Sequence, residues 1–340
     1  MSRACLRAVA HSKCPSGVVA VHIRQDQEPG LLRAGVIGFG AFGRHHATKY
    51  AANPAVALTA IADPSLEARR TAMAKLGVPT ASDWRSLLGT VDLVSICSPA
   101  VTHGEIVRAF LAAGAHVLVE KPIATDLDEA DALIALAETR NRVLTVGHQE
   151  RFVFARTGLL DYDDAPLQVE CWRTGPWTGR GDDVSVVLDL MIHDLDLVHR
   201  LIPGGLDDVT ARGLASRCRH PDDVTANLVF ENGSAAKLRA SRVSGDRQRG
   251  MRAVYPDGVI EIDFMTREIS NSTGRTLNPL VLDDPLGESV TAFVDAVRLG
   301  ADTLVRPEEA RRALETALLI DDACFPAGQV GAPKVYATIG

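Results

Sequence analysis

The stretch Ala34-Gly-Val-Ile-Gly-Phe-Gly-Ala-Phe-Gly43 decides the fold of the first half of this 340-residue chain. It joins a short apolar run to three glycines spaced G-x-G-x-x-G, and residues 44–50 then begin a helical pattern. In this strand–turn–helix setting the first glycine permits a tight reversal, the second lets backbone amides approach a pyrophosphate, and the third lets helix and strand pack closely. The stretch therefore predicts a dinucleotide site with its phosphates at a helix N-terminus. The residues predicted to bind the cofactor here are Gly38, Phe39, Gly40, Ala41, Phe42 and Gly43.

An acidic residue lies where the ribose of such a cofactor would be bound. The apolar run 57–62 ends in Asp63, twenty residues past Gly43. A carboxylate at this spacing accepts hydrogen bonds from ribose hydroxyls, which favours NAD over NADP. The alternative is that Asp63, which precedes Pro64, only caps the next helix.

Helical and strand-like segments continue to alternate after Asp63. Helices are expected at 65–76, 104–113 and 127–139, and strands at 91–97, 117–119 and 143–146. A β-α-β series predicts a doubly wound parallel sheet with helices on both faces, whose ligands bind beyond the carboxyl ends of the strands. Ser98-Pro99, Glu120-Lys121 and Gly147-His148 fall at such ends. A lysine placed there, beside a dinucleotide, suggests redox chemistry.

The pattern changes after Arg151. Strand formers dominate at 167–173, 209–214, 224–230, 235–243, 249–255 and 259–264, with helices at 186–202, 289–299 and 307–322. Short turns between strands imply antiparallel pairing, so we expect an α+β domain with a mainly antiparallel open sheet and helices on one face. The uncovered face predicts a homo-oligomer, a dimer or tetramer. We expect a dinucleotide-binding domain at 34–150 and a substrate-binding and oligomerisation domain at 151–330.

The first 33 residues do not fit either domain. They carry basic residues without an acid until Asp26, and His11-Ser12-Lys13 interrupts any secretory apolar stretch. A targeting peptide, a flexible tail and a translation start placed too early all remain open. We leave this extension outside the fold.

The composition excludes several classes of protein. A net charge of -7 and a pI near 5.8 argue against nucleic acid or an anionic membrane as partner, and no segment approaches the ~20 apolar residues that span a bilayer. The six cysteines form no C-x-x-C pair, so neither a zinc site nor a disulfide framework is indicated. A reducing cytoplasm fits best.

A second group of candidates lies in the predicted helix 186–202. Asp189 and His193 are four residues apart and share one face, and polar groups in an apolar helix are costly unless they find partners or do chemistry. The alternatives are a hydrogen-bonded core histidine and a helix-capping carboxylate. Asp194 and Asp196 lie on other faces and are expected to be structural.

Together these residues resemble the glucose-fructose oxidoreductase, inositol dehydrogenase and MocA family of NAD(P)-dependent sugar and polyol dehydrogenases. The resemblance covers roughly residues 34–325 and rests on the glycine turn, Ser98-Pro99 followed by His103, the sequence Gly114–Pro122 ending in Glu-Lys-Pro, and a D-x-x-x-H helix. It implies that Lys121 and His193 line the substrate pocket beside the nicotinamide, with Asp189 as the accompanying carboxylate. Glu120 is implied near the cofactor ribose.

Oxidising a secondary alcohol requires a hydride acceptor and a base within hydrogen-bonding reach of the hydroxyl. A neutral His193 can accept the proton, and cationic Lys121 can orient the hydroxyl and stabilise developing alkoxide. The two residues could exchange these roles.

Within the family, Gly147-His-Gln-Glu-Arg-Phe152 and Arg173-Thr-Gly-Pro176 resemble the UDP-N-acetylglucosamine 3-dehydrogenases. These oxidise the sugar C3 hydroxyl to a ketone that an aminotransferase converts to a 3-amino sugar, for lipid A or other surface glycans. Val153-Phe154 depart from the asparagine and proline usual there.

His148, Arg151 and Arg173 are candidate substrate ligands, for hydroxyls or a diphosphate. Alternatively, His148 and Arg151 tie the domain junction together and Arg173 is a solvated strand residue. Trp172 and Trp177 could stack on a ring of the substrate or simply pack. Three functions remain open: a nucleotide-sugar dehydrogenase, a free sugar, polyol or inositol dehydrogenase, and a non-catalytic NAD-binding sensor.

Overall fold

The computed structural model describes residues 30–179, 181–281 and 283–324, and the compact unit begins at Leu31. Most of the predicted extension, residues 1–29, therefore lies outside the described residues. Within the described ranges no helix is long and apolar enough to cross a membrane.

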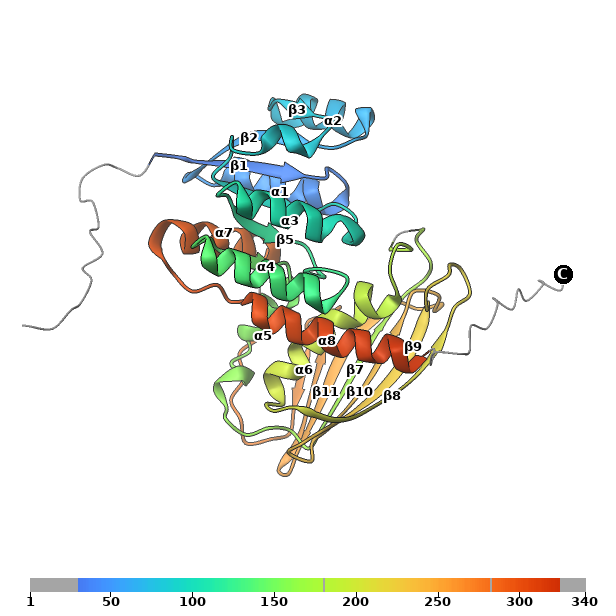
Figure 1. The fold of residues 1–340 in the computed structure, drawn as a ribbon. Coiled ribbons are helices and arrows are strands. Elements are labelled where there is room, and N and C mark those ends of the chain that lie inside the picture. Colours follow the sequence, from blue (N-terminus) through green and yellow to red (C-terminus); the bar gives the residue numbers. More distant parts are fainter. Residues whose placement is uncertain (1–29, 180, 282, 325–340) are drawn as a thin grey trace, which may run out of the picture. The chain divides into compact units, whose positions relative to one another are not determined.

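The first sheet is parallel and six-stranded, with the order β3-β2-β1-β4-β5-β6 (Figure 1). Its strands are β1 (Leu32–Ile37), β2 (Val56–Ala62), β3 (Thr80–Ala81), β4 (Leu93–Ile96), β5 (His116–Val119) and β6 (Leu144–Val146). The connecting helices are α1 (Ala41–Ala52), α2 (Leu66–Leu76), α3 (His103–Ala112) and α4 (Leu127–Thr139). Strand order reverses between β1 and β4, and the crevice at such a reversal is where doubly wound sheets bind ligands. The predicted fold class of this half is confirmed.

A helix from near the end of the chain completes the first half. Helix α7 (Pro285–Leu299) contacts α1, α5 (Gln149–Ala155) and β5. Its buried Val290, Phe293 and Val294 join one apolar cluster with Val36 and Leu118 of the first sheet. We expected this helix to belong with the second domain, but its apolar side is buried against the first sheet instead.

The second sheet has seven strands in the order β13-β12-β11-β7-β10-β9-β8. These are β7 (Gln168–Thr174), β8 (Leu206–Leu214), β9 (Asp223–Phe230), β10 (Ala235–Ser241), β11 (Gln248–Tyr255), β12 (Gly258–Asp263) and β13 (Ile269–Asn271). Neighbouring pairs are antiparallel except β7 and β10, which run parallel. The predicted α+β class with a mainly antiparallel sheet is confirmed, and the sheet is mixed because β7 enters between strands that follow it in the sequence.

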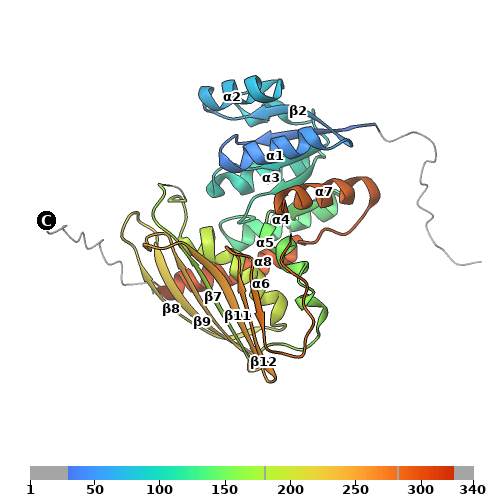
Figure 2. The same ribbon diagram turned by 180° about the vertical axis from the view of Figure 1, so that it is seen from behind.

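Helices cover one face of this sheet. Helix α6 (Ile192–Leu201) packs on α8 (Pro307–Cys324), and α8 packs on β8. Seen from behind, the strands face the viewer without a covering helix (Figure 2). Burial alternates accordingly along β9, where Ala226 and Leu228 are buried while Asn227 and Val229 are exposed.

The predicted helix 186–202 consists of two parts. A π-helical turn, Val187–Met191, precedes α6, and the Ile192 N–H donates to the Val187 carbonyl five residues back. The apolar pattern of the sequence is compatible with either helix type, which is why periodicity missed the wider turn. Such turns recur at functional sites.

Candidate active site

The three glycines of the turn occupy structurally different positions. Gly38 has a φ of +83°, and a Cβ on Gly43 would lie 1.8 Å from the Gly38 carbonyl oxygen. A Cβ on Gly40 would meet nothing within 4 Å. Gly40 is also the N-cap of α1 and has no side-chain capping bond, so the first amides of the helix are free to bind an anion. Gly38 and Gly43 are thus required by the fold, whereas Gly40 leaves space for a ligand.

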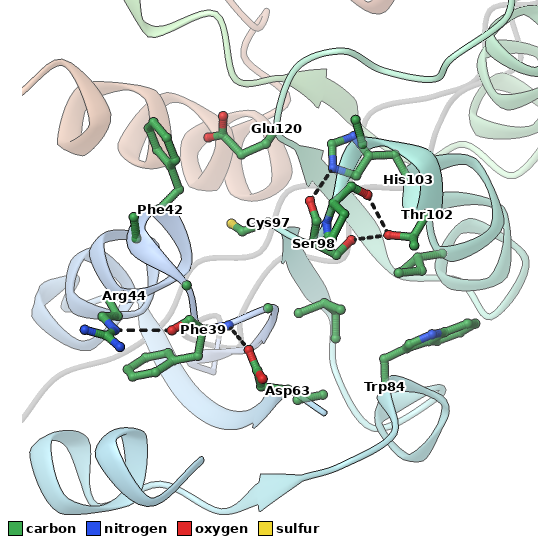
Figure 3. Close-up of a pocket in the computed structure, with 18 of the residues that line it drawn as sticks. Phe39, Phe42, Arg44, Asp63, Trp84, Cys97, Ser98, Thr102, His103 and Glu120 are labelled. Carbon is green, nitrogen blue, oxygen red and sulfur yellow. Dashed lines mark hydrogen bonds between the residues drawn. The ribbon is translucent and has the colours of Figure 1, made fainter. Parts of the chain in front are cut away.

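A cleft of about 1220 Å³ opens in front of this turn. The glycine turn and Asp63 line one side, and Glu120, Lys121 and Asp189 line the other. Figure 3 shows Asp63 beside Phe39 on one side of the pocket and Glu120 on the opposite side. The volume exceeds the ~300–1,000 Å³ of pockets for drug-sized ligands and suits an extended dinucleotide.

The Asp63 carboxylate is held toward the cleft by backbone amides. Its Oδ2 accepts from Phe39 N at 2.7 Å, and its Oδ1 accepts from Ser65 N at 2.7 Å. The side chain that caps α2 is that of Ser65, which accepts from Ala68 N at 3.3 Å. The contacts of Asp63 therefore do not match the alternative of a simple helix cap.

His103 joins two loops at the strand ends. Its Nδ1 lies 2.7 Å from the Pro122 carbonyl oxygen and its Nε2 lies 3.0 Å from the Ser98 carbonyl oxygen. The Lys121–Pro122 peptide bond is cis. His103, Ser98, Lys121 and Pro122 all line the cleft, so His103 connects two loops that form its wall.

Lys121 bridges the two halves of the described chain. Its Nζ donates to Asp189 Oδ1 at 2.9 Å and also to the Asp189 backbone carbonyl. A Cβ on Gly181 would lie 2.3 Å from Asp189 Oδ2, so this glycine packs directly against the carboxylate. The sequence placed Lys121 and Asp189 in one site, and the structure brings them into contact.

The rings of His193 and His148 lie with their centroids 5.9 Å apart in an edge-on arrangement. Both nitrogens of His148 and Nδ1 of His193 are buried without a hydrogen-bond partner among the described residues. Burial, followed by the charges of Lys121 and Arg173, holds the pKa of His193 well below its usual value. His193 is therefore neutral at pH 7 and able to accept a proton.

Arg151 and Arg173 are deeply buried in ion pairs, 1% and 3% exposed. Arg151 Nε donates to Asp196 at 2.9 Å and Nη1 to Glu309 at 2.6 Å. These contacts agree with the junction alternative for Arg151.

Arg173 Nη2 donates to Asp194 at 2.8 Å and Nη1 to Glu150 at 3.1 Å. The alternative of a solvated strand residue is wrong for Arg173. The structural roles expected for Asp194 and Asp196 agree with these pairs.

Several cleft residues were missed by the sequence analysis. Trp84 and Arg85 stack in a short 3-10 turn, Trp84–Leu87, with the guanidinium 4.3 Å from the ring centroid. Asp183, far along the chain, accepts from Ala100 N at 3.1 Å and closes the cleft from the other half. No local pattern marks these positions, and Asp183 reaches the cleft only through the path of the chain in the second half.

A cleft that runs from a glycine turn at a helix N-terminus, with Asp63 beside it, to Glu120 and Lys121 is typical of one class of protein, the NAD(P)-dependent oxidoreductases. A model of the NAD-binding Rossmann domain of one oxidoreductase family matches residues 32–148, and the GFO/IDH/MocA C-terminal domain matches residues 159–261. The chain belongs to this GFO/IDH/MocA family of dehydrogenases that act on CH–OH groups.

Individual relatives agree with this membership. The UDP-N-acetylglucosamine 3-dehydrogenase of Acidithiobacillus ferrooxidans is 35% identical over 302 residues, covering 85% of this chain and 96% of that protein. Its crystal structure, over 86% of this chain and 97% of that one, gives a TM-score of 0.79. The myo-inositol 2-dehydrogenase of Thermotoga maritima is 26% identical over 83% of this chain and 93% of its own length. A scyllo-inositol dehydrogenase from Lactobacillus casei with bound NAD(H) and scyllo-inositol, 21% identical over 86% of this chain and 96% of that one, shares the fold with a TM-score of 0.74.

The glycine geometry predicts opposite effects for two alanine substitutions. Gly43→Ala forces a methyl group onto the Gly38 carbonyl and should lower the unfolding temperature by about 5–10 °C. Gly40→Ala, at a φ of -71° that suits any residue, should leave the unfolding temperature within about 1 °C but weaken NADH binding by about tenfold or more, because the methyl group occupies pyrophosphate space. Thermal melting and NADH fluorescence titration measure the two effects, and unchanged NADH affinity in Gly40→Ala would contradict the assignment.

Proposed function

We propose that the protein oxidises the C3 hydroxyl of UDP-N-acetylglucosamine to the 3-keto sugar with NAD as acceptor. The product would supply an aminotransferase in the synthesis of amino sugars for lipid A or other surface glycans. A relative of that activity at 35% identity supports the reaction, and the Asp63 carboxylate in the cleft supports NAD over NADP because it would repel a 2′-phosphate.

The observation that carries the substrate class is positive charge beside His193. Arg249 is half-buried, and the Glu150 carboxylate oxygen that lies 3.8 Å from it already accepts from Arg173 at 3.1 Å. Arg247 is exposed, and its Nε lies 3.8 Å from where a Cβ on Gly175 would sit. Burial and the charge of Arg173 lower the pKa of Arg249, which means that its charge is poorly compensated.

A neutral polyol would leave these charges uncompensated, whereas a nucleotide diphosphate would pair with them. The argument therefore favours a nucleotide sugar over inositol. In this arrangement Arg247 and Arg249 hold the diphosphate, and His148, with two unpartnered nitrogens, faces the sugar hydroxyls.

The charge states and positions of Lys121 and His193 suggest their roles in catalysis. When bound, the nicotinamide accepts the hydride. The Lys121 ammonium, held by Asp189, orients the hydroxyl and stabilises negative charge on its oxygen. The neutral His193 imidazole receives the hydroxyl proton. Arg151 and Arg173 keep the helix that carries His193 in place and do not contact substrate.

The substrate is tested by absorbance at 340 nm with purified protein and NAD or NADP. UDP-N-acetylglucosamine is compared with N-acetylglucosamine, free sugars and inositols, and a 2-oxo acid is added in parallel to reoxidise any tightly held cofactor. We expect reduction of NAD, or a keto sugar detected by mass spectrometry, with the UDP-sugar alone. Turnover of a free polyol would assign the protein to the inositol dehydrogenases, and NADH binding without any turnover would favour a sensor.

Arg249→Ala tests the diphosphate assignment. The KM for the UDP-sugar should rise about 10- to 100-fold, since a hydrogen bond to a charged group is lost, while kcat changes little. Arg298→Ala removes an exposed arginine at the end of α7, outside the cleft, and should leave both constants unchanged. A fall in kcat with unchanged KM would place Arg249 in the chemical step instead.

The pKa of His193 predicts the acidic limb of the pH profile. Because that pKa is lowered, the imidazole stays neutral below pH 6.5, and kcat/KM should begin to fall only below this ordinary histidine value. Lys121→Met removes one of the charges that lower the pKa of His193, so the acidic limb should move to higher pH. Burial, the larger cause, should still keep the limb below pH 6.5. Lys121→Arg keeps the charge and should keep the wild-type limb. An identical limb in Lys121→Met would mean that another group takes the proton.

We also propose that the uncovered sheet face joins two subunits. Lys237, Glu170, Arg252 and Glu261 are register partners on neighbouring strands β10, β7, β11 and β12. Positive and negative charges alternate along this row. A two-fold axis that packs the row against its copy on a second subunit places each positive charge opposite a negative one, as a self-complementary interface requires. Sedimentation equilibrium should give a dimer or tetramer of the 36.3 kDa chain. The double change Lys237→Glu with Arg252→Glu should shift it to monomer, and a monomeric wild type would refute the interface.

A further inference from the structure

A buried row of hydrogen bonds leads away from the catalytic lysine into the first half of the chain. Glu120, which precedes Lys121, is 6% exposed, and its Oε1 lies 2.9 Å from His46 Nε2. His46 Nδ1 lies 2.9 Å from Ser95 Oγ, and the Tyr50 hydroxyl lies 2.7 Å from the same oxygen. His46, Ser95 and Tyr50 are all fully buried. The row therefore connects α1, which follows the glycine turn, to the strand end that carries the lysine.

The chemistry of these groups determines the direction of the bonds. An ionised Glu120 only accepts, so His46 Nε2 carries a proton and donates it. A neutral His46 then accepts at Nδ1 from the Ser95 hydroxyl, which in turn accepts from Tyr50. Every donor in the row is satisfied, and all point toward Glu120. A second donor, Gln149 Nε2, reaches the same carboxylate oxygen at 2.7 Å.

The row has no exit. Tyr50 is completely buried, and Ser95 is its hydrogen-bond partner among the described residues. Because this row of hydrogen bonds ends inside the protein at Tyr50, it cannot carry a proton from the cleft to the solvent. Proton release is therefore not its role. What remains is control of the carboxylate at its open end.

Burial by itself would raise the pKa of Glu120, but the hydrogen bond that His46 donates, with smaller contributions from Lys121 and Gln149, lowers it overall. The carboxylate is also confined, because a Cβ on Gly147 would lie 2.7 Å from its Oε1. Its other oxygen, Oε2, has no partner among the described residues, and Glu120 lines the cleft. A fixed negative charge therefore sits at the end of the cleft opposite Asp63.

Asp63 marks the adenosine end of the cleft, so the nicotinamide belongs at the end lined by Glu120 and Lys121. The oxidised nicotinamide ring is positively charged and the reduced ring is neutral. A carboxylate held ionised beside it stabilises the oxidised form selectively.

We propose that His46 is a positioning residue that holds Glu120 ionised and in place, so that the site binds NAD⁺ more favourably relative to NADH. This rests on membership of the NAD(P)-dependent family and not on which hydroxyl compound is oxidised.

The test measures the dissociation constants of NAD⁺ and NADH by fluorescence titration and competition, without any substrate. His46→Leu leaves the buried carboxylate without its main donor, and the ratio of the NAD⁺ constant to the NADH constant should rise about tenfold. Glu120→Gln removes the charge directly and should raise the ratio by a similar factor. His46→Gln keeps an N–H donor and should restore much of the wild-type ratio.

The double variant His46→Leu with Glu120→Gln separates this role from a structural one. If His46 acts through Glu120, the double variant shows no larger ratio than Glu120→Gln alone. His199→Leu is the matched control, because it removes another buried imidazole, bonded to Thr316 at 2.8 Å, that does not line the cleft. It should lower the unfolding temperature without moving the ratio.

Ser95→Ala provides a second route if His46→Leu folds poorly. It removes the hydroxyl that donates to Nδ1, so the ratio should move in the same direction by a smaller factor. An unchanged ratio in folded His46→Leu, or in Ser95→Ala where that variant replaces it, overturns the proposal. An unchanged ratio in Glu120→Gln, or additive effects in the double variant, overturns it as well.

Discussion

The contact between Lys121 and Asp189 is the constraint on which the rest of the site depends. Lys121 lies just past β5, whose last three residues are buried, and Asp189 lies in the π-helical turn on the second half. One ammonium group bonds both the carboxylate and the backbone carbonyl of Asp189. His193 lies four residues further on, and burial, followed by the lysine's charge, holds the pKa of its imidazole low, which keeps the ring neutral. The proposed orientation of the hydroxyl and the proposed proton transfer thus depend on one contact between two elements far apart in the sequence.

Buried ion pairs hold those elements in register. Arg151 joins α5 to Asp196 on α6 and to Glu309 on α8, and Arg173 joins β7 to Asp194 on α6. Burying such pairs gains little net stability, but removing one partner costs about 3–5 kcal/mol because the other charge is left unpaired. Their effect is therefore to specify how α6 sits. Because His193 lies on the same helix, these two buried arginines hold the helix that carries the proposed proton acceptor.

Local features were predictable from the sequence, and features set by distant contacts were not. The glycine turn, the alternation of strands and helices and Asp63 depend on residues within a few positions of one another, so spacing and residue type were sufficient. The wide turn at Asp189 was missed because the apolar pattern accommodates either helix type, and the parallel pairing of β7 with β10 was missed because no local signal reports which strands become neighbours. The partners of Arg173 and the row through His46 likewise involve residues tens of positions apart.

By itself the sequence determined a dinucleotide fold, a lysine at a strand end and a histidine on a helix of the second half. Each of these follows from short-range rules of backbone conformation and hydrophobic periodicity. Only the tertiary structure decided that Arg151 and Arg173 are in buried ion pairs, that the charge of Arg249 is poorly compensated, and that His46 of α1 is hydrogen-bonded to Glu120. The physical reason is that charge, hydrogen bonding and burial depend on distances through space, which the linear order of residues does not contain.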